Sequence, residues 1–520
     1  RPLRRVAAAF DDIPIDGVVS ASGTEFPLLD YTYAHRFGGA KIAVKNAHQF
    51  LQNLRNNHVM PSRNERREAI LEEFAGIETK HHITIIPDAQ LCDEVVGLVE
   101  SVDCLIGSID KKFLLLPEEI LISAMRSHQR YFATRDQTGH VAPHYVFVSN
   151  LPKVAGAQAN IIHGNDRVLR ARLADAMFFW KHDCEMTLEN MATQLANVSF
   201  FDRLGTLADK SARLAQSGLA IITHELDPAH YNAQDFVKAA NLCKADLCAQ
   251  TVGEFPELQG IIGGLLLDHA GVNKKIANAV RNHYMPQSSS DPMPKDIGSV
   301  LALADKLDTL VGFFMIGMTP SGSKDPFALR RAGLGIVRIL DETLPIHALL
   351  PMTEQAILLY RAQNLPDQSI EADDTKIANE IVTFLLERLK TGLRAQNYAH
   401  DHIAAALGSN AFGQDVPVLG HVLEALANFV AKQDNMPLLL SIKRIRNILQ
   451  KSDAPARTAI NPEYFQDICE EDLWKCCTQV SKDFAGHISK HDFVGALDCL
   501  CPLQAPVDKY FDVVLINDSD

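Results

Sequence analysis

The first residues that suggest chemistry form a loop with the composition of a phosphate-binding turn. Residues 317–324 read G-M-T-P-S-G-S-K. A nucleotide-binding loop ends in lysine followed by serine or threonine, because the lysine reaches the β- and γ-phosphates and the hydroxyl binds magnesium. Here Ser323 precedes Lys324, and no buried strand is predicted before the loop. The sequence therefore predicts a structured turn before a helix.

Two short segments suggest a metal site instead. K-A-D (residues 244–246) and A-D-K (residues 304–306) lie in helical stretches, and this arrangement is similar to the paired helices of HD phosphohydrolases. Those enzymes hold a divalent ion through a His-Asp dyad and further ligands. Ala245 stands where the histidine is expected, and alanine has no lone pair to offer a metal. The pattern favours an HD-like fold without HD activity, so we predict no catalytic and no metal-binding residue in this chain.

Basic residues form three clusters that could bind phosphate groups. Cations near residue 445 recur at helical spacing on one face, while Ile442, Ile445 and Leu449 lie on another. Such a face is either a solvated helix surface or a phosphate-binding surface, and charge alone leaves both interpretations open. The clusters are Lys443, Arg446, Asn447 and Lys451; Arg167, Arg170 and Arg172; and Lys324, Arg330, Arg331 and Arg338.

Bulk composition limits what kind of protein this is. The 520 residues predict three or four domains at about 150 residues each. A net charge of −14 argues against a protein that binds nucleic acid through its overall electrostatic field. Local basic patches can still bind it, because salt screens charges that are more than about 10 Å apart. The ten cysteines form no C-x-x-C unit, which fits a reducing cytosol and disfavours a zinc ribbon. The longest apolar run, Leu310 to Met318, is shorter than the ~20 residues of a membrane span, so no membrane partner is expected.

Residues 1–155 mix strand and helix patterns, and we predict an α+β domain there. Ser62 to Phe74 has helical periodicity, with Ser62 as N-cap and Glu65 completing a capping box. Tyr131 and Phe132 could stack on unpaired bases, but core positions are the preferred interpretation. Short β-rich runs occur at Leu3–Phe10, Ile15–Ser20, Ile83–Ile86 and Val146–Ser149, and a second helix is predicted at Leu121–Arg130.

Strand patterns disappear after residue 155. Residues 156–345 are predicted to form a helical domain, and residues 346–520 a helical linker and a further helical domain. Val416–Ala431 and Leu438–Lys451 are expected to pair antiparallel, with Pro437 in the first turn of the second helix. The predicted helix at Asn165–Asn190 places Val168, Leu169, Leu173, Ala176 and Phe179 on one face. Other helices are predicted at Leu242–Glu254, Val272–His283, Ser299–Val311 and Pro326–Leu340, with loops at Gln287–Lys295 and Pro366–Asp374.

Several of these segments, in the same order, resemble the β subunit of bacterial glycyl-tRNA synthetase. The resemblance covers nearly the whole chain. Its blocks are H-Q-R-Y-F (128–132), P-H-Y-V-F-V-S-N (143–150), G-N-D-R-V-L-R-A-R-L-A-D-A-M-F-F (164–179), L-G-T-L-A-D-K (204–210), K-A-D-L (244–247), E-F-P-E-L-Q-G-I-I-G (254–263), A-D-K-L-D-T-L (304–310), G-S-K-D-P-F-A-L-R-R-A (322–332) and K-R-I-R-N-I-L (443–449).

The resemblance implies a division of labour between two subunits. The α subunit of that family activates glycine with ATP and Mg²⁺ and transfers it to tRNA, and the β subunit binds tRNA(Gly) in a cytoplasmic α2β2 heterotetramer. It further implies a B3/B4-like α+β domain over residues 1–155, an HD-like domain over 156–345 and an anticodon-binding domain within 346–520. No cofactor is then expected on this chain, and no DNA partner. The implied tRNA-binding residues are Lys443, Arg444, Arg446, Asn447, Lys451, Lys324, Arg330, Arg331, Arg167 and Arg170.

The chain also departs from the family pattern. Ala34-His35-Arg36-Phe37 replaces the usual Gly-His-Arg-Phe. The resemblance predicts further family sequence before Arg1 and after Asp520. Two other functions compete with the tRNA ligase: a metal-dependent HD phosphohydrolase and a stand-alone RNA-binding protein.

Overall fold

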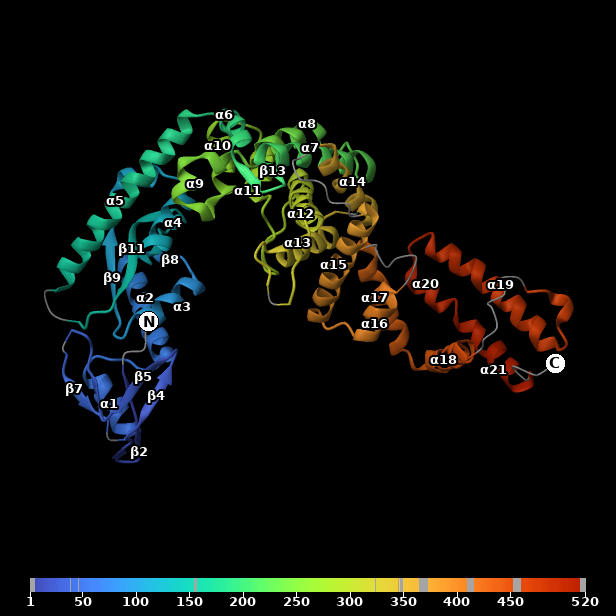
Figure 1. Ribbon diagram of the computed structural model, residues 1–520, viewed down its shortest axis with the longest axis horizontal. Helices are drawn as coiled ribbons and strands as arrows, with labels where there is room; N and C mark the ends of the chain where they lie inside the picture. The colour runs from blue at the N-terminus through green and yellow to red at the C-terminus, as the bar shows by residue number, and fades with distance from the viewer. Residues whose placement is uncertain are drawn as a thin grey trace. The chain divides into compact units, whose positions relative to one another are not determined.

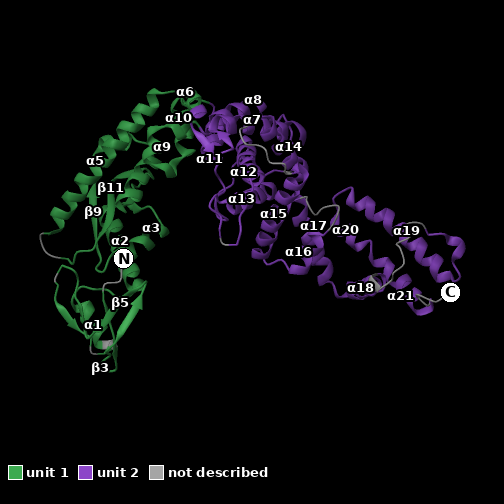
Figure 2. Cartoon of the chain, in the orientation of Figure 1, with its two compact units in different colours: residues 1–194, 245–272 green, residues 195–244, 273–520 purple. Residues whose placement is uncertain are grey.

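The chain folds into two compact units, which are coloured separately in Figure 2. The first comprises residues 1–194 and 245–272, and the second residues 195–244 and 273–520. Helices dominate both units and most strands lie in the N-terminal part of the first (Figure 1), which confirms the predicted mainly helical fold with an N-terminal α+β region. The computed structural model describes residues 5–37, 39–44, 46–153, 157–322, 324–344, 346, 349–363, 373–408, 416–451 and 460–514.

The first described residues form short, locally paired strands. β5 (Thr24–Leu29) lies between β1 (Val6–Ala7), to which it is parallel, and β4 (Val18–Ala21), to which it is antiparallel. The predicted strands at Leu3–Phe10 and Ile15–Ser20 are therefore present, but shorter and shifted. Two further ladders join β2 (Ala9–Phe10) to β3 (Ile13–Pro14), and β6 (Tyr31–Tyr33) to β7 (Lys41–Ala43), which is followed by α1 (Ala47–Asn56).

A four-stranded antiparallel sheet forms the core of the first unit. Its order is β8-β10-β11-β9. The side chains of Ile70 and Val96, from two helices that pack on the sheet, are fully buried in this core. Tyr131 and Phe132 are 4% and 2% exposed, so their interpretation as core aromatics is confirmed. The elements are α2 (Arg63–His81), β8 (Thr84–Ile85), α3 (Ala89–Leu98), β9 (Asp103–Ser108), β10 (Phe132–Arg135) and β11 (Val141–Ser149).

Helix α2 starts where the sequence predicts. The Ser62 hydroxyl accepts the backbone N–H of Glu65 at 3.4 Å, which confirms the cap. The Glu65 carboxylate does not complete a capping box but binds the Arg55 guanidinium at 2.5 Å. The helix continues past the predicted end at Phe74 and stops at His82, which adopts a left-handed conformation.

The long helix α5 (Ala157–Glu185) buries a different face from the predicted one. Leu169, Leu173 and Ala176 are buried as expected. Val168, in contrast, is 45% exposed. The buried face continues from these three residues to Trp180 and Asp183, and residue 168 lies outside it. The rest of this unit comprises η1 (Lys111–Leu115), α4 (Glu118–Ser123), the π-helical η2 (Ala124–His128), α6 (Leu188–Gln194), η4 (Ala245–Cys248), α9 (Gln250–Glu254), η5 (Pro256–Leu258) and α10 (Ile261–His269).

Two of these elements test the predicted helix at Leu242–Glu254. That helix is broken, since η4 is a single 3-10 turn and α9 starts anew at Gln250. Asp183 explains the restart, because its carboxylate accepts the backbone N–H groups of Gln250 at 3.0 Å and Thr251 at 2.8 Å. A buried carboxylate from another helix therefore supplies the N-terminal cap.

Helix α12 (Ile297–Met315) forms the centre of the second unit. All but one of its residues are buried, including the charged Asp305, Lys306 and Asp308. A hairpin of β12 (Ser199–Phe201) and β13 (Gly205–Thr206) interrupts the predicted all-helical region. Around α12 lie α7 (Leu207–Glu225), α8 (Ala233–Leu242), α11 (Lys274–Asn282), α13 (Leu329–Glu342), α14 (Leu349–Ala362) and α15 (Asp374–Ala395).

The remaining helices confirm some boundaries and correct one pairing. α17 spans Val416–Ala431 as predicted, and α18 begins at Met436, with Pro437 in its first turn. α18 packs against α21 rather than along α17, which packs on α16, α20 and α13. The loop predicted at Pro366–Asp374 lies largely outside the described residues. The other elements are α16 (His400–Leu407), η6 (Gln433–Asn435), α18 (Met436–Lys451), η7 (Pro462–Tyr464), α19 (Ile468–Ile488), α20 (Phe493–Asp498), η8 (Cys501–Leu503) and α21 (Gln504–Val513).

None of the helices in the described part of the chain combines enough length with enough apolar character to cross a bilayer.

Candidate functional site

A cluster of charged side chains lies buried around α12 in the second unit. The Lys244 ammonium donates to Asp305 Oδ2 at 2.7 Å and lies 2.9 Å from His283 Nε2. The same ammonium lies 3.9 Å from the centre of the Tyr284 ring. Lys244 is 3% exposed and His283 is fully buried. One lysine therefore joins the end of α8, the end of α11 and the middle of α12.

A second lysine and an arginine from α7 extend the cluster. The Lys210 ammonium lies 3.0 Å from Asp305 Oδ1 and 2.9 Å from Asp308 Oδ2. Arg213 donates from Nε to Asp308 Oδ1 at 2.6 Å. The Tyr360 hydroxyl of α14 donates to Asp308 Oδ2 at 3.1 Å. We call Lys210, Arg213, Lys244, His283, Asp305, Lys306 and Asp308 the buried charged centre.

Burial and neighbouring charges shift the pKa values within this centre. Burial lowers the pKa of His283, and the adjacent Lys244 ammonium lowers it further, so this imidazole is neutral. Burial alone would raise the pKa of Asp305, but Lys210 and Lys244 outweigh it and hold that pKa far below its ordinary value. Burial lowers the pKa of Lys306 to about 8, against the opposing pull of Asp305. The Lys306 ammonium donates to the carbonyls of Tyr284 at 3.0 Å and Met285 at 2.8 Å.

The contacts of Lys244 show how the segment that resembles an HD metal site is used in this fold. Ala245 has no side chain that could bind a metal, and the neighbouring Lys244 ammonium contacts His283 and Asp305. Asp246 points elsewhere, because its carboxylate accepts the backbone N–H of Gly260 at 2.6 Å. The nitrogen and oxygen atoms that could bind a metal are thus hydrogen-bonded to an ammonium group. Among the described residues, no group of three or more His, Cys, Asp or Glu has a geometry that could hold a metal ion.

Helix α18 exposes the described side chains of the first predicted cluster. Lys443, Arg446 and Asn447 are all exposed. Arg444 is exposed as well, and its guanidinium lies 4.1 Å from the centre of the Phe511 ring. Lys451 ends the helix, and its side chain is outside the described set. A hollow of about 330 Å³ is lined by Leu440, Lys443, Arg444, Asn447 and Ile448.

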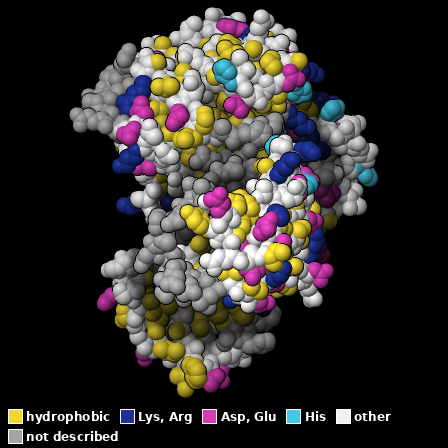
Figure 3. Space-filling model, turned by 90° about the vertical axis from the view of Figure 1, so that its right-hand side faces the viewer, with side chains coloured by type: hydrophobic (Ala, Val, Ile, Leu, Met, Phe, Trp, Pro, Cys, Tyr) yellow, Lys and Arg dark blue, Asp and Glu magenta, His cyan; other side chains and the backbone are white. Residues whose placement is uncertain are grey.

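The apolar face of α18 is also open to solvent. Ile442 is 46% exposed and Leu449 is 68% exposed. Figure 3 shows hydrophobic side chains intermixed with both basic and acidic ones on the face of the molecule that it presents. A second cavity of about 290 Å³ lies beside the first and is lined by Ile445, Ile448, Leu449, Leu473, Val507, Tyr510 and Phe511. Cationic, amide, aliphatic and aromatic groups are therefore presented together, as a surface for single-stranded nucleic acid requires.

The loop before α13 has the predicted turn and a structural arginine. The backbone of Ser321 and Lys324 pairs across the turn, and Ser323 lies outside the described residues. The Asp325 carboxylate accepts the N–H groups of Leu329 at 2.9 Å and Arg330 at 3.0 Å and thereby caps α13. The Arg330 guanidinium donates to the carbonyl of Gly322 at 2.7 Å. Arg330 therefore ties down the loop, whereas Lys324 and Arg331 are exposed.

The arginines of α5 divide in the same way. Arg170 binds the Asp110 carboxylate at 3.0 Å, and Arg172 binds Glu254 at 3.0 Å. Arg167 is exposed, and no described acidic side chain forms an ion pair with it. The residues of each cluster therefore lie on one helix, or on one loop and the helix that follows it.

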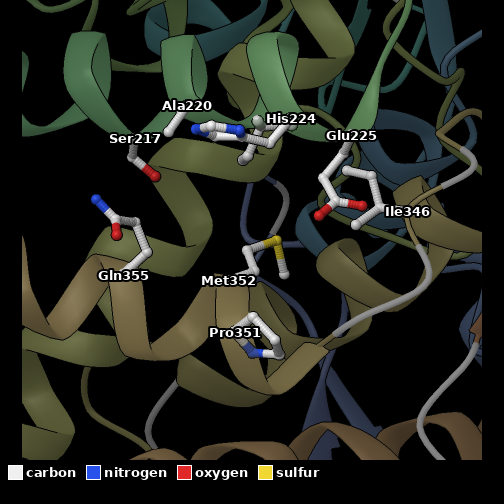
Figure 4. Close-up of a pocket in the computed structure, with 9 residues that line it drawn as sticks. Ser217, Ala220, His224, Glu225, Ile346, Pro351, Met352 and Gln355 are labelled. Atoms are coloured by element: carbon white, nitrogen blue, oxygen red, sulfur yellow. The ribbon is translucent and has the colours of Figure 1, made fainter.

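A cavity of about 250 Å³ lies between α7 and α14 (Figure 4). His224 and Glu225 extend from α7, and Met352 and Gln355 face them from α14. A carboxylate and an apolar floor make this cavity a poor site for phosphate. None of its residues was singled out from the sequence.

Comparison with known proteins places the chain in a family. A family model described as "Glycyl-tRNA synthetase beta subunit" matches residues 1–408. The glycine–tRNA ligase beta subunit of Rhodospirillum centenum is 36% identical over 550 residues, covering 100% of this chain and 75% of that protein. The corresponding subunit of Rickettsia conorii is 37% identical, with 100% and 74% covered. That of Methylobacillus flagellatus is 35% identical, with 98% and 71% covered. The chain therefore belongs to the glycyl-tRNA synthetase beta subunit family and is a subunit of an aminoacyl-tRNA synthetase.

Proposed function

We propose that this chain binds tRNA(Gly) and positions it for glycylation on a partner α subunit. Glycine activation then takes place on that partner, which uses ATP and Mg²⁺, and the two kinds of subunit form an α2β2 heterotetramer. Residues 1–155 would supply a B3/B4-like domain, residues 156–345 an HD-like scaffold, and residues 346–520 the linker and anticodon-binding domain. Family membership supports this division of labour.

The exposed surface of α18 is the observation that carries the tRNA-binding part of the proposal. Lys443 and Arg446 are solvent-exposed, and neither forms an ion pair with a described residue. Free cations of this kind bind phosphates and release counterions. The neighbouring hollow contains Asn447 and Arg444, whose amide and guanidinium groups can bind the edge or face of an unpaired base.

The role of such a subunit in the reaction is positioning. Holding the tRNA acceptor end against an activated amino acid converts a bimolecular step into an effectively unimolecular one. For well-oriented reactants this lowers the activation barrier by about 7–11 kcal/mol. Lys324 and Arg331 are exposed beside the start of α13 and Arg167 on α5, and we assign them to contacts with the tRNA backbone.

The alternative phosphohydrolase function requires a divalent ion between His283 and Asp305. Both side chains are instead hydrogen-bonded to the Lys244 ammonium, which favours the tRNA-binding proposal. A pull-down with a class II α subunit separates the proposal from a stand-alone RNA-binding protein. The chain alone should form no glycyl-adenylate, and addition of the α subunit should give glycyl-tRNA.

Charge reversal on α18 tests tRNA binding directly. The variant Lys443→Glu/Arg446→Glu should bind tRNA more weakly, and the slope of log affinity against log salt should fall by about 0.7–0.9 for each phosphate that is no longer neutralised. A matched control is Lys376→Glu/Lys482→Glu, which reverses two exposed charges on α15 and α19. An equal loss of affinity in both variants, or an unchanged slope in the first, would remove α18 from the interface.

A further inference from the structure

A basic cavity occurs on the second unit, and its lining includes none of the residues assigned above. It has a volume of about 320 Å³ and opens between α11 and the loop that precedes α12 (Figure 1 shows both helices). Its lining residues are Lys275, Asn278, Asn282, Pro292, Met293, Pro294, Lys295 and Asp296. We propose that this cavity binds a phosphate group of the RNA backbone, an inference that rests on the proposed tRNA binding.

The helix that forms one wall presents three polar side chains in register. Lys275, Asn278 and Asn282 are spaced by three and four residues, so they lie on one side of α11. The opposite side, with Ile276 and Val280, is buried against α8 and α12. The orientation of the polar side is therefore determined by the packing of the apolar one.

The loop that forms the other wall is held by hydrogen bonds at both ends. Asp291 accepts the backbone N–H groups of Gln287 at 2.7 Å and Ser288 at 2.8 Å. Arg338 of α13 donates to the Ser288 carbonyl at 2.8 Å. At the other end, the Ser299 hydroxyl donates to the carbonyl of buried Pro294 at 2.6 Å. The cavity wall is thus organised before any ligand arrives, which lowers the entropic cost of binding.

The charges of the cavity select an anion. Lys275 and Lys295 approach from separate segments, and no described carboxylate forms an ion pair with either of them. The one acidic residue of the lining, Asp296, lies 3.4 Å from the His230 imidazole. Two ammonium groups repel a metal cation and offer six N–H donors, which suits the oxygens of a phosphate. In a chain with a net charge of −14, two lysines in one cavity without an ion pair to a described residue favour an anionic partner.

Removal of the two lysine charges tests the site. The variant Lys275→Gln/Lys295→Gln should bind an in vitro transcribed tRNA(Gly) several-fold more weakly, and the salt slope should fall by about 0.7–0.9 for one phosphate. The matched control, Lys274→Gln/Lys376→Gln, removes two exposed charges, one of them on the same helix but outside the cavity. All substituted side chains are exposed, so both variants should keep the wild-type unfolding midpoint.

Two outcomes separate this inference from the proposed function. If the wild-type chain binds tRNA and the cavity variant behaves like its control, the cavity is not a phosphate site although the proposed function stands. If the wild-type chain retains no tRNA, the proposed function fails. Titration with inorganic phosphate then shows whether the cavity binds an anion at all. Broadening of the phosphorus-31 resonance by the wild type, absent with the cavity variant, would preserve an anion site, and equal spectra would overturn it.

Discussion

Replacement of Lys244 by methionine tests the account of the buried charged centre. Methionine keeps much of the volume of lysine but removes its charge. The substitution leaves the Asp305 carboxylate with Lys210 as its remaining cation, at 3.0 Å. It also removes the hydrogen bond to His283 and the contact with the Tyr284 ring.

The expected cost follows from burial. Removal of one partner of a buried ion pair destabilises a protein by about 3–5 kcal/mol, because the other charge stays desolvated. Lys210 offsets part of that cost, while removal of the cation–π interaction adds up to about 2 kcal/mol. We therefore expect Lys244→Met to lower the free energy of opening by about 3–5 kcal/mol. At about 1.4 kcal/mol per factor of ten, the equilibrium constant for opening rises by about two to three and a half powers of ten.

Hydrogen exchange of the α12 amides provides a local assay, because a chain with two compact units need not unfold in a single step. Lys274→Met, on an exposed position, should change protection by less than about 0.5 kcal/mol. The double variant Lys244→Met/Asp305→Asn should recover part of the lost stability, since it removes both charges. The reasoning would be refuted if Lys244→Met lowered the protection free energy of the α12 amides by less than about 1 kcal/mol, or if the double variant recovered none of the loss.

Three further predictions follow from other interactions. The pKa of Lys306 lies at about 8 in the folded chain, so the unfolded chain binds that proton more tightly. The free energy of unfolding should therefore rise by up to about 1.4 kcal/mol per pH unit between pH 8 and about 10.5. The variant Lys306→Met should lack this slope. Gly218→Ala would make a Cβ overlap with the buried ring of Phe236 and should cost about 1–3 kcal/mol in denaturant unfolding. Gly76→Ala, with open space around it, should instead stabilise α2 by about 0.5–1 kcal/mol. Arg331→Gln should lower the salt slope of tRNA binding without changing the unfolding midpoint, while Arg330→Gln should lower the midpoint because Gly322 loses its donor.

Helix positions could be predicted from the sequence wherever packing and local signals agree. Ser62 and Pro437 mark helix starts through capping and backbone restriction, which are local effects, and both predictions are confirmed. The break inside the predicted helix at Leu242–Glu254 could not be foreseen, because the carboxylate that caps the new start is Asp183, more than sixty residues away. The hairpin near residue 203 was missed because its strands are only two and three residues long.

The candidate site shows the same limit. Exposure of Lys443 and Arg446 follows from helical spacing, so that surface was found from the sequence. The buried charged centre was not, although a signal was present. Asp305, Lys306 and Asp308 lie in a helix that is otherwise mostly apolar, and carboxylates in a buried helix require cationic partners. Which lysines supply them depends on the packing of α7 and α8 onto α12, and this is not encoded in local spacing.

The same distinction bears on how an acidic chain would bind a polyanion under the proposed function. Counterions are released only by cations that are solvated before binding. The four cations of the buried charged centre are desolvated and bonded within the fold, and Arg170 and Arg330 already have protein partners. These residues add to the count of basic side chains but not to the salt dependence of binding. Under the proposed function, affinity for tRNA would come from the smaller set of exposed cations, which includes Lys443, Arg446 and the two lysines of the proposed phosphate cavity. The measured salt slope should then follow the number of such residues rather than the net charge.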